Sequence, residues 1–329
     1  MWKRWAIGWA CLCVLSTVLT GCMTTSGANA AKIPELPEEL TLDDEGVPLL
    51  TVYDIAADSY AQTDVETYLE GVLAGEMRND WPEEALKAQA ILARTFVMRF
   101  ISTKDSQYDG ADISTDVKEA QAYAPNLVND RVKKAVRDTR GLVVSYQGEL
   151  ANTWFHAHSG GMTELPVEGL EYKENPPYTK RASSFESEDA PDGVKAWQVS
   201  FSLEEVEKAC ADAGVSVGGI QTVETGEKSE SGRSVTLLVN GKPVSAPAFR
   251  IQIGADRLKS TLITDIEVKD NAVTFSGKGY GHGVGMSQWG AYQMAREGSS
   301  AMDIISHYFN RVDVVPLWDG ADSQAEKEQ

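Results

Sequence analysis

The sequence has little cysteine. Of its 329 residues only four are cysteines, and Cys11, Cys13 and Cys22 all fall in the first 22 residues. Cys210 has no partner for a disulfide, and its helix-like surroundings predict a small buried side chain instead of a nucleophile. The composition therefore excludes a fold held together by disulfides.

Basic residues are also scarce. The chain has 30 lysines and arginines against 49 aspartates and glutamates, which gives a net charge of −19. This balance makes nucleic acid a poor partner and favours a neutral glycan, or one that carries its own positive stems. A hydrophobic content of 42% is enough for one large domain or two modest ones.

Long hydrophobic runs are absent except near the start. The run from Trp5 to Leu19 follows Lys3 and Arg4 and ends in Leu-Thr-Gly-Cys22. A transmembrane anchor or a buried helix is the alternative, but the run is short for a membrane span and small residues precede the cysteine. We expect residues 1–21 to be a lipoprotein signal peptide, Cys22 to carry the lipid, and the protein to be extracytoplasmic and anchored to the cell membrane.

The rest of the chain divides into three parts. Residues 22–49 lack periodicity and predict a flexible tether, residues 50–312 predict the functional domain, and residues 313–329 form an acidic tail. We expect an α+β fold, a single irregular domain of short helices and antiparallel β-hairpins. Its site should lie between the helix pair 64–103 and the β and glycine-rich regions.

The helix pair is predicted from apolar residues at three- and four-residue spacing. Thr63 and Glu66 suggest a capping box at the first helix, which should stop near Gly75, and Pro82 suits the start of the second. Glu76 falls at the corner between them. A glutamate there is by default a solvated surface residue.

The neighbours of Glu76 suggest a second interpretation. Met77 and Trp81 are apolar groups that could desolvate the carboxyl and raise its pKa. A carboxylic acid that keeps its proton near neutral pH is what a glycosidase uses to protonate a leaving oxygen. Lys87 and Arg94, seven residues apart, share a helical face that could hold an anionic or sugar ligand, while Gln89 points elsewhere.

Two histidines follow on a predicted strand, 151–157. His156 and His158 would point to the same face, so a metal site has to be considered. No cysteine or further histidine pattern lies nearby to complete a ligand set, so we favour His156 as a donor lining the site, without a metal. The segment Ser159-Gly-Gly161 could present backbone N–H groups to a ligand.

A glycine-rich stretch spans residues 277–291. Its spacing matches neither the dinucleotide-binding pattern nor the P-loop pattern. Alternating glycines would let the backbone lie flat against a ligand while Tyr280 and His282 project on one side as a sugar-binding wall. A tight structural turn beneath the helix that opens at Ser287 is the alternative.

Several motifs between about residue 50 and residue 312 stand out as a set: Ala74-Gly-Glu-Met77, Trp81-Pro-Glu-Glu-Ala-Leu-Lys-Ala-Gln-Ala90, Phe155-His156 with Ser159-Gly-Gly161, Phe249-Arg250 with Leu258-Lys-Ser-Thr261, and Gly279-Tyr-Gly-His-Gly-Val-Gly-Met-Ser-Gln-Trp-Gly290. This set resembles the stage II sporulation protein D (SpoIID)/LytB family. The family includes lytic transglycosylases that cut peptidoglycan glycan strands, particularly denuded strands without stem peptides, and relatives called amidase enhancers.

The resemblance implies roles for individual residues. Glu76 would be the catalytic acid, and the substrate-binding residues would be Lys87, Gln89, Arg94, His156, Ser159, Tyr280, His282 and Gln288. Some members carry zinc ligands, His and Cys, just before the Gln-x-Tyr segment, whereas this chain has Lys118-Glu-Ala120, so no metal or other cofactor is expected. His158 also replaces the usual small hydroxyl residue.

The implied reaction uses one carboxyl twice. Glu76 would protonate the oxygen between N-acetylmuramic acid and N-acetylglucosamine and then deprotonate the muramyl C6 hydroxyl, which closes a 1,6-anhydro ring. A hydrolase would need a second carboxylate, for which Asp80, Glu83, Glu84 and Glu164 are candidates. The contrasting function is a non-catalytic wall-binding lipoprotein that activates a cell-wall amidase as its partner.

Overall fold

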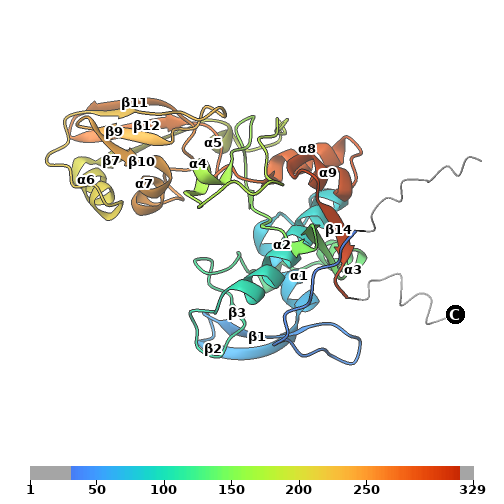
Figure 1. Ribbon diagram of the computed structural model, residues 1–329. Helices are drawn as coiled ribbons and strands as arrows, with labels where there is room; N and C mark the ends of the chain where they lie inside the picture. Colours follow the sequence, from blue (N-terminus) through green and yellow to red (C-terminus); the bar gives the residue numbers. More distant parts are fainter. Residues whose placement is uncertain (1–30, 319–329) are drawn as a thin grey trace, which may run out of the picture. The chain divides into compact units, whose positions relative to one another are not determined.

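Two helices, α1 (Val65–Glu76) and α2 (Glu83–Thr103), lie at the centre of the first of two hydrophobic cores. The structure is a computed structural model that describes residues 31–318 (Figure 1). The helix pair predicted over 64–103 is confirmed. The apolar residues of α1 form one face and are all buried: Val65, Tyr68, Leu69, Val72 and Leu73.

The predicted capping box at the start of α1 is wrong. The helix begins at Val65, so Thr63 lies one position before the cap. The cap is Asp64, whose carboxylate accepts the backbone N–H of Thr67 at 2.9 Å. Glu66 is thereby left free to pair elsewhere.

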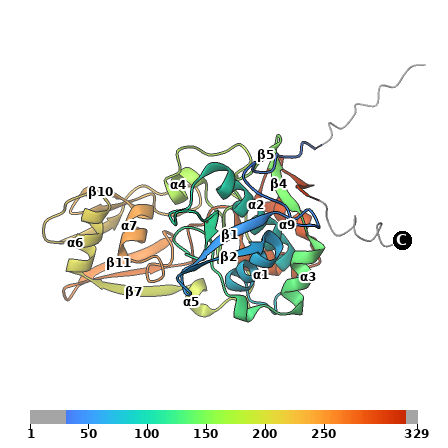
Figure 2. The ribbon, with the colours of Figure 1, turned by 90° about the horizontal axis from the view of Figure 1, so that it is seen from below.

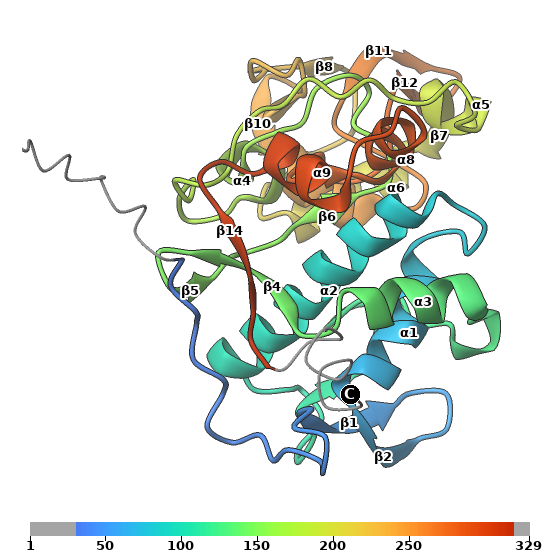
Figure 3. The same ribbon diagram turned by 90° about the vertical axis from the view of Figure 1, so that its right-hand side faces the viewer.

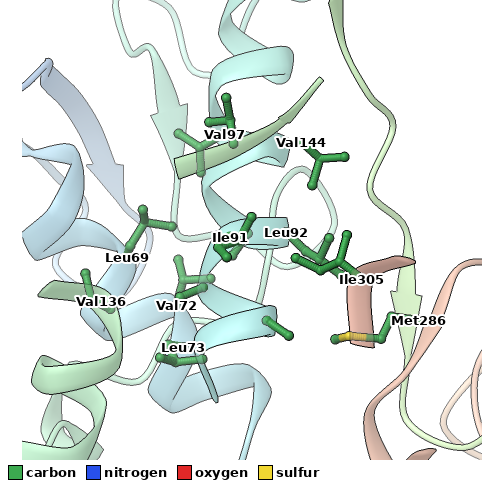
Figure 4. Close-up of a cluster of buried hydrophobic side chains, with 14 of the residues drawn as sticks. Leu69, Val72, Leu73, Ile91, Leu92, Val97, Val136, Val144, Met286 and Ile305 are labelled. Atoms are coloured by element: carbon green, nitrogen blue, oxygen red, sulfur yellow. The ribbon is translucent and has the colours of Figure 1, made fainter. Parts of the chain in front are cut away.

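Helix α2 is surrounded by other elements. Figure 3 shows α8 (Gln288–Arg296) and α9 (Ala301–Tyr308) beside it, and α1 and α3 (Asp130–Asp138) also pack against it. Its alanines at 85, 88, 90 and 93 are fully buried, which allows these close approaches. Figure 4 shows the side chains that meet here, among them Leu73, Ile91, Leu92, Met286 and Ile305.

The other helices are short. They are η1 (Pro125–Leu127, a 3-10 helix), α4 (Pro166–Leu170), α5 (Asp192–Lys195), α6 (Leu203–Asp212) and α7 (Ala246–Ile253). Among the described residues, no helix combines the length and the apolar composition needed to cross a membrane.

The strands form small sheets. In the first core the sheet orders are β2-β1-β3, β14-β4-β5 and β13-β6. These strands are β1 (Leu49–Asp54), β2 (Ser59–Asp64), β3 (Ile113–Ser114), β4 (Leu142–Tyr146), β5 (Glu149–Leu150), β6 (Phe155–His156), β13 (Met286–Ser287) and β14 (Asp313–Pro316). All pairs are antiparallel except β1 with β3 and β6 with β13.

A second hydrophobic core extends from Trp197 to Phe275. Its antiparallel sheets have the orders β10-β9-β8 and β11-β12-β7. Figure 2 shows α6 and α7 beside these strands. The strands are β7 (Trp197–Ser202), β8 (Val223–Thr225), β9 (Thr236–Val239), β10 (Lys242–Ser245), β11 (Ile263–Lys269) and β12 (Ala272–Gly277). With its helices and small sheets, the fold is α+β as predicted.

The structure differs from the predicted tether and tail. Within the tether, Leu36 and Leu40 pack against the first core, and Leu42 forms a β-bridge with Pro48. At the other end β14 begins at Asp313, where the tail was expected, because its backbone completes the edge of β4. The predicted signal peptide and Cys22 lie outside the described residues.

Candidate active site

Glu76 is the last residue of α1, one position beyond the predicted stop. Its Oε1 atom accepts the backbone N–H of Ala122 at 2.7 Å, and its side chain is partly exposed. Burial raises the pKa of the Glu76 carboxyl, and the hydrogen bonds from Ala122 and Gln288 lower it by less, so the pKa lies above its ordinary value. A raised pKa is what the apolar neighbours led us to expect.

The segment that carries Ala122 lies very close to α1. A Cβ atom added at Gly75 would come within 2.7 Å of the carbonyl carbon of Ala122 and 2.8 Å of the backbone nitrogen of Tyr123. Any larger residue would therefore push this segment away. Gly75 thus allows the contact between Ala122 and Glu76.

The Gln288 side chain connects the end of α1 to α2 and α8. The Gln288 side chain, at the start of α8, donates from Nε2 to the backbone oxygen of Glu76 at 3.1 Å and lies 3.4 Å from Oε1 of Gln89 on α2. Gln89 and Gln121 are both buried, and Nε2 of Gln89 and both polar atoms of the Gln121 amide have no protein partner. A buried amide without a partner costs free energy, so these two side chains are the groups here that a bound molecule would satisfy.

His156 lies next to the start of α8, the helix that carries Gln288. The residue before Gln288, Ser287, pairs with His156 in the parallel β6–β13 contact, whereas most of the strand predicted over 151–157 is irregular. His156 is buried, and its Nδ1 lies 3.1 Å from the carbonyl of Val284, so Nδ1 carries the proton. Burial, His282 and Arg233 hold the pKa of His156 well below its usual range, which keeps the ring neutral.

The glycine-rich stretch supports this arrangement. Gly285 has φ +73°, and a Cβ atom there would lie 1.9 Å from the carbonyl oxygen of Trp154, the residue that accepts the N–H of Met286. His282 lies near His156, with ring centroids 5.8 Å apart. Burial first, then Arg250 and Arg233, lower the pKa of His282 to about 3.

Tyr280 and Ser159 are both tied to the segment around His158. Tyr280 pairs through its backbone with His158. Ser159 is fully buried, and both its N–H and its hydroxyl donate to Glu186. The N–H groups of Gly160 and Gly161 are also used internally, so the prediction that this segment presents free N–H groups to a ligand is wrong.

Glu186 is a residue that the sequence analysis missed. Besides Ser159 it accepts the hydroxyl of Ser287, at 2.9 and 3.0 Å, and its Oε2 lies 4.0 Å from Nε2 of His158. It therefore connects the 158–161 segment to the start of α8. Glu186 lies in an irregular segment with several acidic residues. No sequence pattern in that segment distinguishes Glu186 from the neighbouring acidic residues.

The structure does not bring Arg94 to this site. Arg94 is fully buried, and its guanidinium binds both carboxylate oxygens of Glu66, at 2.6 and 3.1 Å, and the carbonyl oxygens of Leu142 and Val136. Glu66 and Glu76 are ten residues apart on α1, about 15 Å along the helix. Arg94 thus holds α2 to the far end of α1.

Lys87 is also engaged in ion pairs within the protein. Its ammonium lies 2.8 Å from Glu83, 3.2 Å from Glu84 and 3.3 Å from Asp138. Burial lowers the pKa of Lys87, but the hydrogen bonds that its ammonium donates to Glu83 and Glu84 outweigh this effect and raise the pKa above its usual range. Lys134 joins the same network, so Lys87 is charged and held between α2 and α3.

The four candidates for a second carboxylate are each held in ion pairs. Asp80 pairs with Arg78, and Glu83 and Glu84 pair with Lys87. Glu164 is fully buried beside Arg181, at 2.8 Å, and also accepts the hydroxyls of Ser229 and Ser231.

A metal centre is not supported by the residues present. Within residues 31–318, no group of three or more His, Cys, Asp or Glu side chains could hold a metal ion. In the segment before Gln121, Glu119 already accepts the hydroxyl of Ser106 and the N–H of Gln107, and Lys118 is exposed. This segment does not fit the zinc ligands that some family members carry.

Two protein families match parts of the chain. The family described as Stage II sporulation protein (SpoIID) matches residues 53–146, which contain Glu76, Gln89 and Gln121. A domain of unknown function (DUF8618) matches residues 183–285, which include the second core.

Individual proteins match over most of the chain. Stage II sporulation protein D of Bacillus amyloliquefaciens is 32% identical over 80% of this chain and 77% of its own length. An uncharacterized protein of Brachyspira hyodysenteriae is also 32% identical, over 77% of this chain and 67% of its own length. The amidase enhancer of Bacillus subtilis is 30% identical over 73% of this chain but only 39% of its own length. The chain therefore belongs to the stage II sporulation protein D (SpoIID)/LytB family.

Proposed function

We propose that this protein is a peptidoglycan lytic transglycosylase that cuts the bond between N-acetylmuramic acid and N-acetylglucosamine in denuded glycan strands. The observation that carries the proposal is the environment of Glu76, a partly buried carboxyl with a raised pKa among amides that lack protein partners. A carboxyl of this kind can hold a proton near neutral pH and give it to a leaving oxygen.

The two oxygens of Glu76 would have different roles. Oε1 accepts the N–H of Ala122, which supports Oε2 as the oxygen that carries the proton. In the first step Oε2 protonates the glycosidic oxygen as the bond to the muramyl C1 breaks. In the second step the resulting carboxylate takes the proton of the muramyl C6 hydroxyl, whose oxygen attacks C1 and closes the 1,6-anhydro ring. The enzyme is then protonated as it was at the start.

The surrounding groups would position the strand. Gln89, Gln121 and the neutral His156 have buried polar atoms without protein partners, and we assign these atoms to hydroxyl or acetamido groups of the sugar. Gln288 would belong to the same set of residues, because its side chain connects Glu76 to Gln89. The absence of an unpaired carboxylate among the four candidates for a second acid favours the intramolecular reaction over hydrolysis.

Mass spectrometry of the products tests this reaction. Purified glycan strands without stem peptides should give fragments that end in 1,6-anhydro-N-acetylmuramic acid. Fragments with reducing muramic acid ends would mean that water is the nucleophile, and a second carboxylate would then have to be found.

A second candidate function is that of a non-catalytic amidase enhancer, which the similarity to the Bacillus subtilis protein of that name favours. In that case Glu76 would bind sugar, and a cell-wall amidase would be the partner. An assay of amidase activity with the Glu76→Gln variant distinguishes the two functions. If the protein acts only by binding, the variant should enhance the amidase as well as the wild type does.

We also propose that the protein works outside the cytoplasm, anchored to the membrane by a lipid on Cys22. The short apolar run and the Leu-Thr-Gly-Cys22 sequence support this location. A membrane-anchored enzyme of this kind could act in sporulation or in remodelling of the vegetative wall.

A further inference from the structure

A cavity of about 400 Å³ lies beside the C-terminal half of α2. The segment 151–154 and the residues that follow α4 complete its walls. Six of the residues that line it are Phe96, Arg99, Lys104, Trp154, Tyr172 and Lys173. We call it the Arg99 pocket. Glu76 is not among its lining residues, and the proposed reaction gives the pocket no role.

The charge of the Arg99 pocket is opposite to that of the whole chain. The chain has a net charge of −19, yet the charged residues that line this pocket are all basic. Arg99 binds two neutral oxygens, Oδ1 of Asn152 at 2.7 Å and the carbonyl of Leu150 at 2.6 Å. Within the described residues neither Arg99 nor Lys104 pairs with a carboxylate, so their charges are available to an anionic ligand.

The other walls of the pocket are aromatic. The rings of Trp154 and Tyr172 meet edge to face, with centroids 5.1 Å apart, and Lys104 lies 5.8 Å from the centre of the Phe100 ring. Both Trp154 and Tyr172 are partly exposed. Aromatic faces beside a few polar groups suit a ligand with an apolar face and hydroxyl groups, which describes a sugar ring.

The pocket lies on the same side of α2 as the candidate active site. Phe96 and Phe100 are seven and eleven residues after Gln89, so all three share one helical face, at separations of about 10 and 17 Å along the axis. The segment from Asn152 to His156 also runs from the pocket to the active site. A glycan strand bound at Glu76 could therefore continue into the pocket.

We propose that the Arg99 pocket binds a carboxylated sugar, the N-acetylmuramic acid residue of a denuded strand, through its free lactyl carboxylate. This assignment rests on the proposed function for the identity of the polymer. Lys104 and Arg99 bind the carboxylate, and Trp154 contacts the ring. A stem peptide converts this carboxylate into an amide, so the pocket selects strands from which the peptides have been removed.

Calorimetric titration of the wild-type protein tests the proposal with two matched probes. They are N-acetylmuramic acid and its methyl ester, which has the same bulk without the charge. We expect the acid to bind about tenfold more tightly than the ester, the usual effect of a charge-assisted hydrogen bond, and added salt to reduce the difference.

Lys104→Glu should abolish this preference, because Lys104 is exposed and its replacement reverses a charge without opening the core. Lys269→Glu, the same change on an exposed residue of β11, should keep the preference. Equal binding of acid and ester to the wild type, or an unchanged preference in Lys104→Glu, would overturn the proposal. Neither probe contains the bond that is cut, so a protein that shows the preference but cuts no strands would contradict the proposed reaction alone.

Discussion

Glu76 is subject to two opposing effects of its surroundings. Burial favours the protonated acid, whereas the hydrogen bonds from Ala122 and Gln288 favour the carboxylate, and burial is the stronger effect. The folded protein therefore binds this proton more tightly than the unfolded chain does. By linkage, this carboxyl costs stability as pH rises from the ordinary glutamate pKa, about 4.3, through the raised pKa.

The first prediction at this scale is a pH-dependent stabilisation by Glu76→Gln. The amide cannot ionise and can still accept the Ala122 N–H, so the variant should melt at the same temperature as the wild type below pH 4 and at a higher temperature at pH 8. Thermal unfolding at the two pH values measures the difference, with the exposed Glu224→Gln as control. A melting-temperature difference independent of pH would mean that the Glu76 pKa is not raised.

The second prediction concerns Arg94. Its guanidinium is fully buried against Glu66, so Arg94→Ala should lower the free energy of unfolding by about 3–5 kcal/mol, because an unpaired carboxylate stays behind. Urea unfolding measures this, and the double variant Glu66→Leu, Arg94→Leu should lose less than the sum of its single changes. If Arg94→Ala were as stable as the wild type and differed only in a raised KM, Arg94 would be a substrate-binding residue and this account of it would be wrong.

At the scale of elements, the contact between α1 and the 121–123 segment sets the position of the Ala122 N–H. Gly75→Ala places a methyl group within 2.8 Å of backbone atoms of Ala122 and Tyr123, so the segment must move and the hydrogen bond to Glu76 must lengthen. We expect a loss of strand cleavage of about tenfold or more, since small misplacements of catalytic groups are costly.

Thr67→Ala is the matched control for Gly75→Ala, because Thr67 is exposed on the same helix. Initial rates on denuded strands and circular dichroism of both variants separate a local effect from unfolding. A folded Gly75→Ala protein with the wild-type rate would show that the Ala122 contact is not needed.

Local sequence patterns predicted some elements well. The helix pair follows from apolar spacing, because this signal lies within a few residues. The start of α1 was placed one residue too early, because Thr63 and Asp64 are both good capping residues and the local pattern does not decide between them. Glu66 was likewise assigned to a cap, although its partner, Arg94, lies 28 residues away.

At the scale of the whole molecule, the candidate site is assembled from distant segments. Gln288 reaches Glu76 from 212 residues away, and Glu186 reaches Ser287 from 101 residues away. The sequence could nominate Glu76, His156 and Gln288 through motifs that resemble a family. It could not show that Glu186 joins them, since no motif marks that residue.

Anchoring is a prediction for the whole chain. Cys22→Ser should leave the precursor unprocessed and without lipid, because transfer of the diacylglycerol group needs the thiol. Membrane fractionation with mass spectrometry of the amino terminus measures this, and Cys13→Ser serves as control. Appearance of Cys22→Ser as a processed, detergent-extracted lipoprotein would rule the anchor out.

The central claim is that Glu76 is the acid and base of a transglycosylase. The most direct measurement is the rate at which Glu76→Gln releases anhydro-ended fragments from denuded strands, compared with the wild type and with Glu70→Gln on the same helix. We predict a loss of about a hundredfold or more for Glu76→Gln, with strand binding retained, and near wild-type rates for Glu70→Gln. A Glu76→Gln protein that cuts strands as fast as the wild type would contradict the account.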